Sequence, residues 1–249
     1  KYLPVLHQCQ VLIAGGGTAG VAAAIGASKT SDNVMVAEYF SGFGGTQSLG
    51  LVGNYYHGYV DGFAAMQTYN MCHAGLPRNA VGRLIWYYMD LRKNNISLLS
   101  NTVICGSIIK NRKCHGVIAS YQGKIGIIKA DVTVDSTGDS DVLSFCNGQF
   151  RIGSLRDGSM QNSSQWEIYG KDYDLDIFDQ TKYSDILRGL YMTHAKNSAD
   201  DFSPMLTPRE SRRFIGEYTI TMRDVLCSKY FDDCICIART DCDPHGAMS

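Results

Sequence analysis

The pattern of apolar and polar positions at the start of the chain predicts a strand, a helix and a second strand. Residues 9–14 (CQVLIA) form a short apolar run of strand length, and a second run at 34–38 (VMVAE) ends in an acidic residue. Between them, the small residues of about 18–29 (TAGVAAAIGASK) predict a helix whose backbone can lie close to a sheet. Because a strand, a crossover helix and a strand form a right-handed unit, we expect the two strands to be parallel neighbours in one sheet.

The pattern further along the chain predicts one more helix and a group of strands. Apolar positions within 79–94 recur at helical spacing. Residues 96–130 contain four short apolar runs separated by turn residues, which predicts a strand followed by an antiparallel meander. The run at 131–136 (DVTVDS) predicts a further strand. Residues 151–208 are polar and weakly periodic, and 209–226 is expected to form a charged helix.

These elements predict an α/β fold with a Rossmann-like, three-layer nucleotide-binding domain over residues 1–150. The antiparallel meander is expected to be inserted near 101–130. We expect a smaller substrate or cap region over 151–208, followed by a segment over 209–249 that packs back toward the first domain.

Glycines at the end of the first predicted strand indicate where a ligand binds. Gly15, Gly17 and Gly20 stand at G-x-G-x-x-G spacing, and Glu38 follows Gly20 by 18 residues at the end of the next strand. In this context Gly15 makes a tight turn, Gly17 lets the backbone approach a pyrophosphate, and Gly20 lets the helix pack against the sheet. The helix N-terminus would hold the phosphates, and Glu38 would accept a hydrogen bond from a ribose hydroxyl. The sequence therefore predicts a dinucleotide site.

A second glycine-rich segment favours FAD as the dinucleotide. Gly42 to Gly53 follows the acidic residue, where an NAD-only domain would continue into further strand–helix units. A flavin needs such a segment because its ribityl chain and ring extend beyond the pyrophosphate. The strand that ends in Ser136-Thr137-Gly138-Asp139 offers another place where the backbone passes a bound cofactor. The alternatives are a flexible surface loop and a plain NAD-dependent dehydrogenase.

Composition and charge narrow the function classes. The 249 residues are 45% hydrophobic and 19% charged, with a net charge of -1, so neither nucleic acid nor an anionic membrane is an expected partner. No apolar run approaches the roughly 20 residues of a membrane helix. Several of the nine cysteines stand singly within predicted elements, which favours reduced thiols and a cytoplasmic location. The spacing of Cys227, Cys234, Cys236 and Cys242 matches neither zinc nor iron–sulfur patterns, so we expect no metal.

Several strings resemble the FAD-dependent oxidoreductases of the glutathione-reductase-type superfamily. They are VLIAGGGTAGVAAA at 11–24, GGT at 44–46 and VTVDSTGDSDV at 132–142. RESRRFIGEYTI at 209–220, followed by Asp224 and Val225, is similar to one branch of that superfamily. The resemblance implies a two-domain flavoprotein that oxidises or reduces a small molecule through flavin N5. Where the family usually has Ala-Thr-Gly, this chain has Ser136 as the first residue. The expected cofactor-binding residues are Gly15, Gly17, Thr18, Ala19, Gly20, Glu38, Gly44, Gly45, Thr46, Val103, Thr137, Gly138 and Asp139.

Three side chains are candidates for catalysis. His57, just beyond the flavin loop, is the expected base, since hydride transfer to a flavin needs a base near the carbon being oxidised. Arg209 and Arg213 are expected to bind an anionic substrate or the flavin. The alternatives are a packed or surface histidine, and arginines paired with Glu210 and Glu217. A further alternative is a flavin-binding scaffold subunit without chemistry of its own.

The resemblance also implies a partner. Members of the family continue beyond the position that corresponds to Ser249 and end in a segment that closes over the flavin ring. We therefore expect a second polypeptide, either a processed half or a separate subunit, or a homo-oligomer, covering an apolar face around 42–60 and 209–249.

Overall fold

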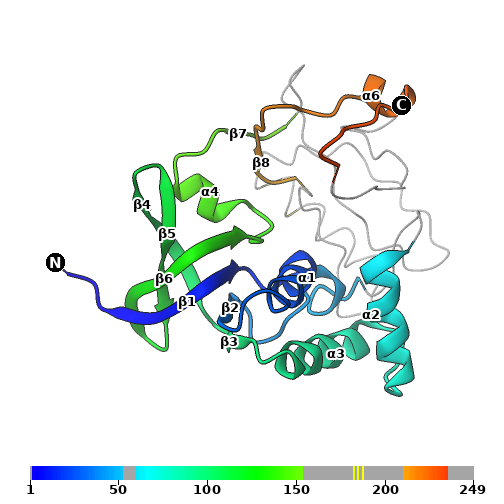
Figure 1. Ribbon diagram of the computed structural model, residues 1–249, viewed down its shortest axis with the longest axis horizontal. Helices are drawn as coiled ribbons and strands as arrows, with labels where there is room; N and C mark the ends of the chain where they lie inside the picture. The colour runs from blue at the N-terminus through cyan, green and yellow to red at the C-terminus, as the bar shows by residue number, and fades with distance from the viewer. Residues whose placement is uncertain are drawn as a thin grey trace. The chain divides into compact units, whose positions relative to one another are not determined.

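The computed structural model describes residues 2–52, 60–153, 182, 184, 187 and 210–234. The chain divides into two units, one formed by 1–150 with 214–241 and the other by 151–213 with 242–249. A six-stranded sheet forms the centre of the first unit (Figure 1). Its strands, in the spatial order β3-β2-β1-β6-β5-β4, are β1 (Val5–Ala14), β2 (Val34–Ala37), β3 (Ser97–Leu99), β4 (Val103–Lys110), β5 (Lys113–Tyr121) and β6 (Lys124–Asp135).

The strands around β1 are parallel, as the sequence predicts. β1 pairs with β2 from Val11 opposite Val34 to Ala14 opposite Ala37, and β2 pairs in parallel with β3. On its other side β1 pairs in parallel with β6. The expected strand–helix–strand unit is thus confirmed, with α1 (Thr18–Ala27) as its crossover.

The meander is part of the same sheet, and one boundary prediction is wrong. The runs at 123–130 and 131–136 were expected to be separate strands, but residues 124–135 form the single strand β6 of 12 residues. One edge of β6 pairs in parallel with β1, and the other pairs antiparallel with β5. The change of neighbour needs no break in the chain, because each strand edge carries its own row of hydrogen-bonding groups.

Two apolar clusters hold the sheet. On one face, Ile13 and Val36 pack with Val21 of α1 and with Tyr87 and Leu91 of α3 (Ala80–Lys93). The opposite face carries the second cluster, with members Leu12, Ala14, Met35, Ala37, Leu99, Val117, Ala119, Ile128, Ala130 and Val142. The alternation of these two sets along β1 and β2 is the period of two expected of strands buried on both faces.

Among the helices, α3 confirms the prediction for 79–94, whereas α2 (Gly62–His73) was not predicted. The buried positions of α2 include the polar Gln67, so its sequence lacks a clean apolar stripe. Gln67 donates a hydrogen bond to Asp90 of α3 over 2.8 Å and accepts one from the Trp86 indole. Polar contacts between α2 and α3 therefore take the place of some of the apolar contacts whose periodicity would have predicted α2.

The predicted helix over 209–226 is largely wrong. Within the described residues of this segment, only α6 (Met222–Leu226) is helical, and Arg213–Phe214 forms β8, which pairs with β7 (Phe150–Arg151). The remaining elements are the short helix α4 (Asp141–Phe145) and the 3-10 turn η1 (Gly45–Gln47).

Candidate functional site

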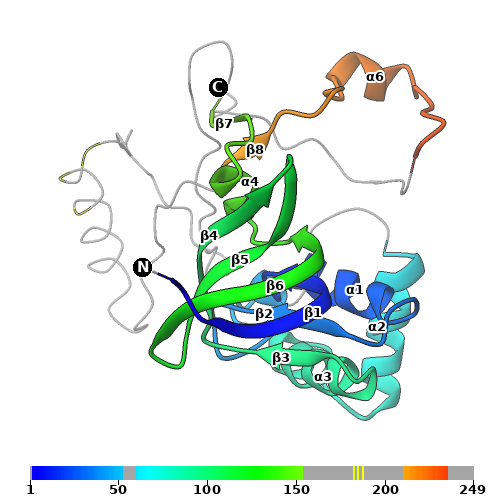
Figure 2. The same cartoon turned by 60° about the vertical axis from the view of Figure 1, so that its left-hand side comes forward.

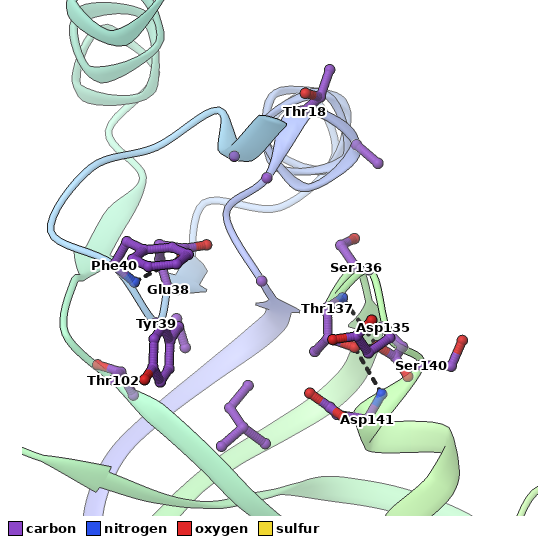
Figure 3. A pocket seen from close by; sticks show the side chains of 18 of the residues that line it. Thr18, Glu38, Tyr39, Phe40, Thr102, Asp135, Ser136, Thr137, Ser140 and Asp141 are labelled. Carbon is purple, nitrogen blue, oxygen red and sulfur yellow. Dashed lines mark hydrogen bonds between the residues drawn. The ribbon is translucent and has the colours of Figure 1, made fainter. Parts of the chain in front are cut away.

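The carboxyl ends of three parallel strands meet at one cavity of about 840 Å³. The sheet register brings Ala14 of β1 beside both Ala37 of β2 and Asp135 of β6. Ligands of open α/β sheets bind outside this edge, and the volume lies within the range of roughly 300–1,000 Å³ of ligand pockets. Figure 3 shows Glu38 and Thr102 on one side of the cavity, Thr137 and Asp141 on the other, and Thr18 of α1 above them.

Two glycines in the turn after β1 are required by the backbone itself. Gly15 has a φ of +96°, and a Cβ there would lie 2.4 Å from the Ser136 carbonyl oxygen. A Cβ on Gly20 would lie 1.9 Å from the carbonyl oxygen of Gly15. Any side chain at either position would therefore force the turn away from β6 or from α1.

Gly17 differs, because its side-chain direction is open. A Cβ at Gly17 would meet no heavy atom within 4 Å, and its φ of -65° is one that any residue adopts. Gly17 is the N-cap of α1, which has no side-chain cap and no acidic residue in its first turn. The first backbone N–H groups of the helix therefore retain their hydrogen-bonding capacity for an anion. We call the open space beside Gly17 and these N–H groups the open cradle, and a phosphate group fits it.

Glu38 is buried at the end of β2, with 6% of its surface exposed. One carboxylate oxygen accepts a hydrogen bond from the Gly16 N–H at 2.5 Å, and the other accepts one from the Phe40 N–H at 2.8 Å. Each oxygen retains a further lone pair, so the carboxylate can also accept from a ribose hydroxyl in the cavity that it lines. Glu38 thus has a structural role that the sequence did not reveal.

The second glycine segment is tied to the first. The Gly44 N–H donates to the Gly16 carbonyl at 2.8 Å, and the Thr18 hydroxyl donates to the Gly44 carbonyl at 2.9 Å. A Cβ on Gly45 would lie 3.0 Å from the Gly17 Cα. These contacts place Gly45 and its neighbour Thr46 on the cavity wall next to the open cradle.

A network of hydrogen bonds stabilises the turn after β6. Asp135 accepts hydrogen bonds from the Thr137 hydroxyl at 2.7 Å and from the Leu143 N–H at 2.9 Å. The Thr137 hydroxyl in turn accepts from the Asp141 N–H at 2.8 Å. Gly138, at a φ of +78°, has open space where a Cβ would lie. This hydrogen-bond network holds the backbone of 136–141 along the cavity.

The cavity brings together all the predicted cofactor-binding residues except Gly20 and Gly44, which lie behind its wall against Gly15 and Gly16. It also adds residues that the sequence reasoning missed. Tyr39 and Phe40 follow Glu38 and are 62% and 52% exposed, with their rings edge to face at 5.0 Å. Their position directly after Glu38, the acidic residue at the end of β2, could have predicted that they line the site. The other missed lining residues are Ala37, Thr102, Ile104, Asp135, Ser140 and Asp141, whereas Ser136 lines the cavity at the strand end that the sequence analysis named.

The catalytic candidates fall elsewhere. His57 and Arg209 lie outside the described residues. Arg213 forms an ion pair with Glu210 and donates to the Gly153 carbonyl at 2.8 Å, while Glu210 accepts from the Gly153 N–H at 2.9 Å. The pairing with Glu210 is the alternative foreseen for this arginine, although on a strand rather than a helix. A role for Arg213 toward substrate or flavin stays a prediction.

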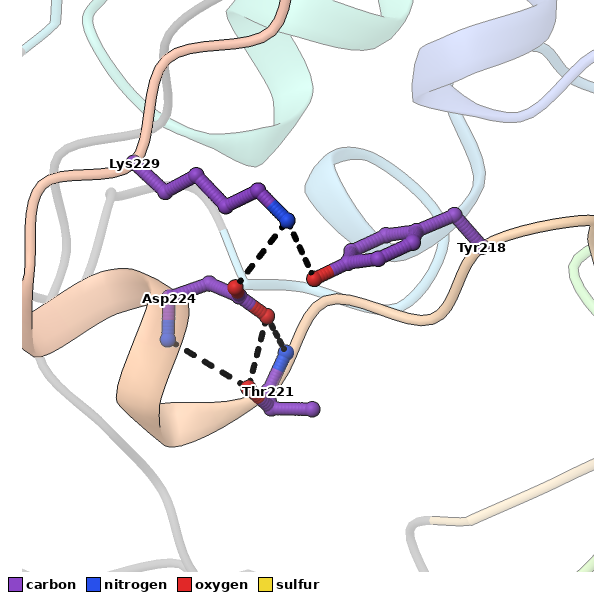
Figure 4. A network of polar contacts seen from close by, with 4 residues as sticks. All are labelled: Tyr218, Thr221, Asp224 and Lys229. Carbon is purple, nitrogen blue, oxygen red and sulfur yellow. Dashed lines mark hydrogen bonds and ion pairs between the residues drawn. The ribbon is translucent and has the colours of Figure 1, made fainter.

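The end of the same signature string forms a local polar network (Figure 4). Thr221 caps α6 in a reciprocal arrangement with Asp224: the Asp224 N–H donates to the Thr221 hydroxyl, and the Thr221 N–H donates to the Asp224 carboxylate at 2.8 Å. Lys229 pairs with Asp224 at 3.5 Å and donates to the Tyr218 hydroxyl at 2.8 Å. Hydrogen bonds from the hydroxyl and N–H of Thr221 and from Tyr218, followed by the charge of Lys229, hold the pKa of Asp224 well below its usual range. These contacts cap α6 and tie Lys229 to it.

No cluster of three or more metal-ligating side chains occurs among the described residues. Cys227 and Cys234 are exposed, and Cys236 and Cys242 lie outside the described part of the chain. Over the described ranges, no helix is both long and apolar enough to cross a membrane.

Several solved structures show distant similarity to this chain. L-proline dehydrogenase from P. horikoshii is 12% identical, with 63% of this chain and 59% of that chain covered and a TM-score of 0.45. THI4 from Thermovibrio ammonificans is 17% identical over 59% and 66% of the two chains, with a TM-score of 0.44. A 3-ketosteroid dehydrogenase from Rhodococcus jostii RHA1 is 16% identical over 53% and 46%, with a TM-score of 0.41. The chain thus spans less than two thirds of the length of each of these proteins.

No curated protein matches the sequence. A protein family does: residues 10–203 and 166–249 match the family described as FAD dependent oxidoreductase. The match extends over more than half of the chain and includes every strand end and turn of the cavity. The chain therefore belongs to the FAD-dependent oxidoreductases, and FAD is its cofactor.

Proposed function

We propose that the protein transfers a hydride between a small organic substrate and the N5 atom of FAD. One observation carries the proposal: the glycine turn, the α1 N-terminus, Glu38 and the 136–141 turn line a single cavity at the carboxyl edge of the sheet. When bound, FAD supplies the redox chemistry, and the protein supplies binding and orientation.

Different residues of the cavity would bind different parts of the cofactor. The open cradle at Gly17, with the free N–H groups of α1, would hold the diphosphate. Glu38 would bind the adenosine ribose, since it lines the cavity and each carboxylate oxygen retains a lone pair beyond its backbone hydrogen bond. Gly45, Thr46 and the turn held by Thr137 would guide the rest of the molecule toward the substrate.

For the chemical step we retain the candidates from the sequence. His57 would act as the base that removes a proton from the carbon or heteroatom being oxidised. Arg209 and Arg213 would bind an anionic group of the substrate. Replacement of His57 by glutamine should slow flavin reduction by about 10²- to 10⁴-fold, the usual contribution of a positioned base, while FAD binding is retained.

We also propose a partner polypeptide that covers the flavin end of the site. Leu51 and Val52, beyond the second glycine segment, are 56% and 46% exposed, and Leu226 and Tyr230 in the C-terminal segment are each 78% exposed. A closed, dry site favours hydride transfer, so covering such groups would serve catalysis as well as solubility. In native mass spectrometry we expect an oligomer or a complex. A single chain that turns over substrate by itself would contradict this part of the proposal.

The visible spectrum and a cofactor titration test the central proposal against its alternatives. The purified protein should show oxidised-flavin bands, and the apoprotein should regain them with FAD but not with FMN. Anaerobic addition of a panel of amino acids, amines and 2-hydroxy acids should bleach the bands, with dithionite as the control for complete reduction. Bands that only dithionite bleaches would favour the non-catalytic scaffold. Tight NAD binding without flavin bands would favour an NAD-dependent dehydrogenase.

A further inference from the structure

Helix α3 is apolar on two sides. Toward the sheet it buries Ala80, Tyr87 and Leu91, which are at most 8% exposed. On its other side it exposes four large apolar side chains. Val81 is 56% exposed, Ile85 42%, Tyr88 53% and Met89 48%. In Figures 1 and 2 the helix lies at the edge of the helical layer.

The four exposed side chains form one stripe. Successive residues of an α-helix are about 100° apart, so positions 81, 85, 88 and 89 occupy an arc of only about 100°. The stripe runs for about 12 Å along the axis at 1.5 Å per residue. Arg92 continues it in the last turn, and Arg78 precedes it just before the N-cap Asn79. We call these four apolar residues and two arginines the α3 stripe.

A helix on the surface of a monomer normally presents polar residues on the side that faces water. The buried side of α3 packs against the sheet, so the α3 stripe is not part of the core of this unit. Scattered apolar residues on a surface need no explanation, but a contiguous stripe with basic ends indicates an interaction surface. Its composition of Tyr, Met and Arg is the one enriched in the cores of protein–protein interfaces.

The charges at the ends decide between the candidate occupants. Arg78 and Arg92 are exposed, and neither forms an ion pair with any described residue. Asp90, the acidic residue of α3, is buried and accepts a hydrogen bond from Gln67, so it does not neutralise them. A second copy packed antiparallel about Ile85 would place Arg78 of one chain against Arg92 of the other. Like charges therefore oppose self-association through this stripe.

A membrane surface is a poor match as well. Stable binding of an interfacial helix needs a long apolar face with many basic residues or a second anchor, and the α3 stripe offers four apolar side chains. We propose that the α3 stripe docks a helical segment of another polypeptide, which carries an apolar stripe with an acidic side chain at each end. This inference does not depend on the proposed function, because none of the α3 stripe residues lines the cavity.

The test uses the purified full chain and two synthetic helical peptides of about 20 residues, a length that can sustain a helix. Both peptides carry the same leucine stripe, with glutamates at its two ends in one peptide and lysines in the other. In fluorescence anisotropy, the glutamate peptide should bind about fivefold or more tightly than the lysine peptide, because exposed ion pairs contribute modestly. Reversal of both arginines, Arg78→Glu with Arg92→Glu, should invert this preference.

Matched variants separate the stripe from apolar surface in general. Ile85→Asp should abolish binding of the glutamate peptide, whereas Ile109→Asp on β4, where the isoleucine is 45% exposed, should leave it unchanged. Each variant is first checked for FAD content and unfolding midpoint, and Tyr88→Ser replaces Ile85→Asp if that variant does not fold. Equal binding of the two peptides would overturn the proposal. So would a homodimer that Ile85→Asp dissolves, or binding to phosphatidylserine vesicles that Ile85→Asp removes.

Discussion

Replacement of Gly17 by alanine should separate the stability of the protein from its affinity for FAD. Gly17 has a φ of -65°, and a Cβ there would have no neighbour within 4 Å, so the folded chain can accept the methyl group. The change from glycine to alanine at an N-cap costs at most about 1 kcal/mol. The same methyl group projects from the open cradle where we place the diphosphate. Overpacking costs about 1–3 kcal/mol, which corresponds to about 5- to 150-fold weaker FAD binding.

Two neighbouring glycines supply the controls. Gly20→Ala should destabilise the apoprotein itself by about 1–3 kcal/mol, because its Cβ would lie 1.9 Å from the Gly15 carbonyl oxygen. Gly26→Ala, on the exposed side of the same helix with no atom within 4 Å of its Cβ, should stabilise the apoprotein by about 0.5–1 kcal/mol without affecting FAD.

The assay combines urea unfolding of each apoprotein with a titration that follows the quenching of FAD fluorescence. Gly17→Ala should have a near-normal unfolding midpoint and weak FAD binding, and Gly20→Ala should be impaired in both. Wild-type FAD affinity in Gly17→Ala would refute the placement of the diphosphate over Gly17. A severe loss of stability in that variant would refute the assignment of its side-chain direction as open.

Three further outcomes follow from the described contacts. Glu38→Ala should lower the unfolding free energy of the apoprotein by about 1–3 kcal/mol, because the buried Gly16 N–H and the partly buried Phe40 N–H lose their acceptor; unchanged urea unfolding would contradict this. The lowered pKa of Asp224 means that the α6 cap is fully present above the usual carboxyl range and is lost only as the pH falls through that lowered pKa. In Thr221→Ala, the carboxyl-carbon NMR titration of Asp224 should therefore move upward. Burial raises the pKa of Cys9 to about 11, so a thiol reagent at pH 8 should label Cys9 only after unfolding.

The sequence allowed the glycine turn to be predicted because each of its residues has a local physical requirement. Gly15, Gly20 and Glu38 stand at spacings set by a strand, a turn and a helix, and the structure places them around one edge of the sheet. The length of β6 could not be predicted in the same way. Its pattern has no break at residue 131, and whether an apolar run is one strand or two depends on which neighbours pair with it.

Other features depended on tertiary contacts that leave little trace in a sequence. The helix α2 is held partly through Gln67, whose partners lie on another helix. The string at 209–226 carries charges at helical spacing, yet Glu210 and Arg213 use theirs to bind the backbone of Gly153. The hydrogen bonds of Glu38 to two backbone N–H groups depend on the fold of the turn and were likewise beyond the reach of the pattern.

The single strand β6 has a consequence for the order of biogenesis. The wall of the cavity is drawn from residues 15–46 and from 102–141, and the pairing of β1 with β6, across more than a hundred residues of chain, brings the turn at 136–141 to the rest of the wall. Contacts so distant in sequence close slowly and expose strand edges until they do. During synthesis the nascent chain can build the glycine turn early, but it cannot retain FAD until β6 has left the ribosome. FAD then stabilises only the chains that have completed this pairing. Flavin supply during expression should therefore determine the yield of folded protein.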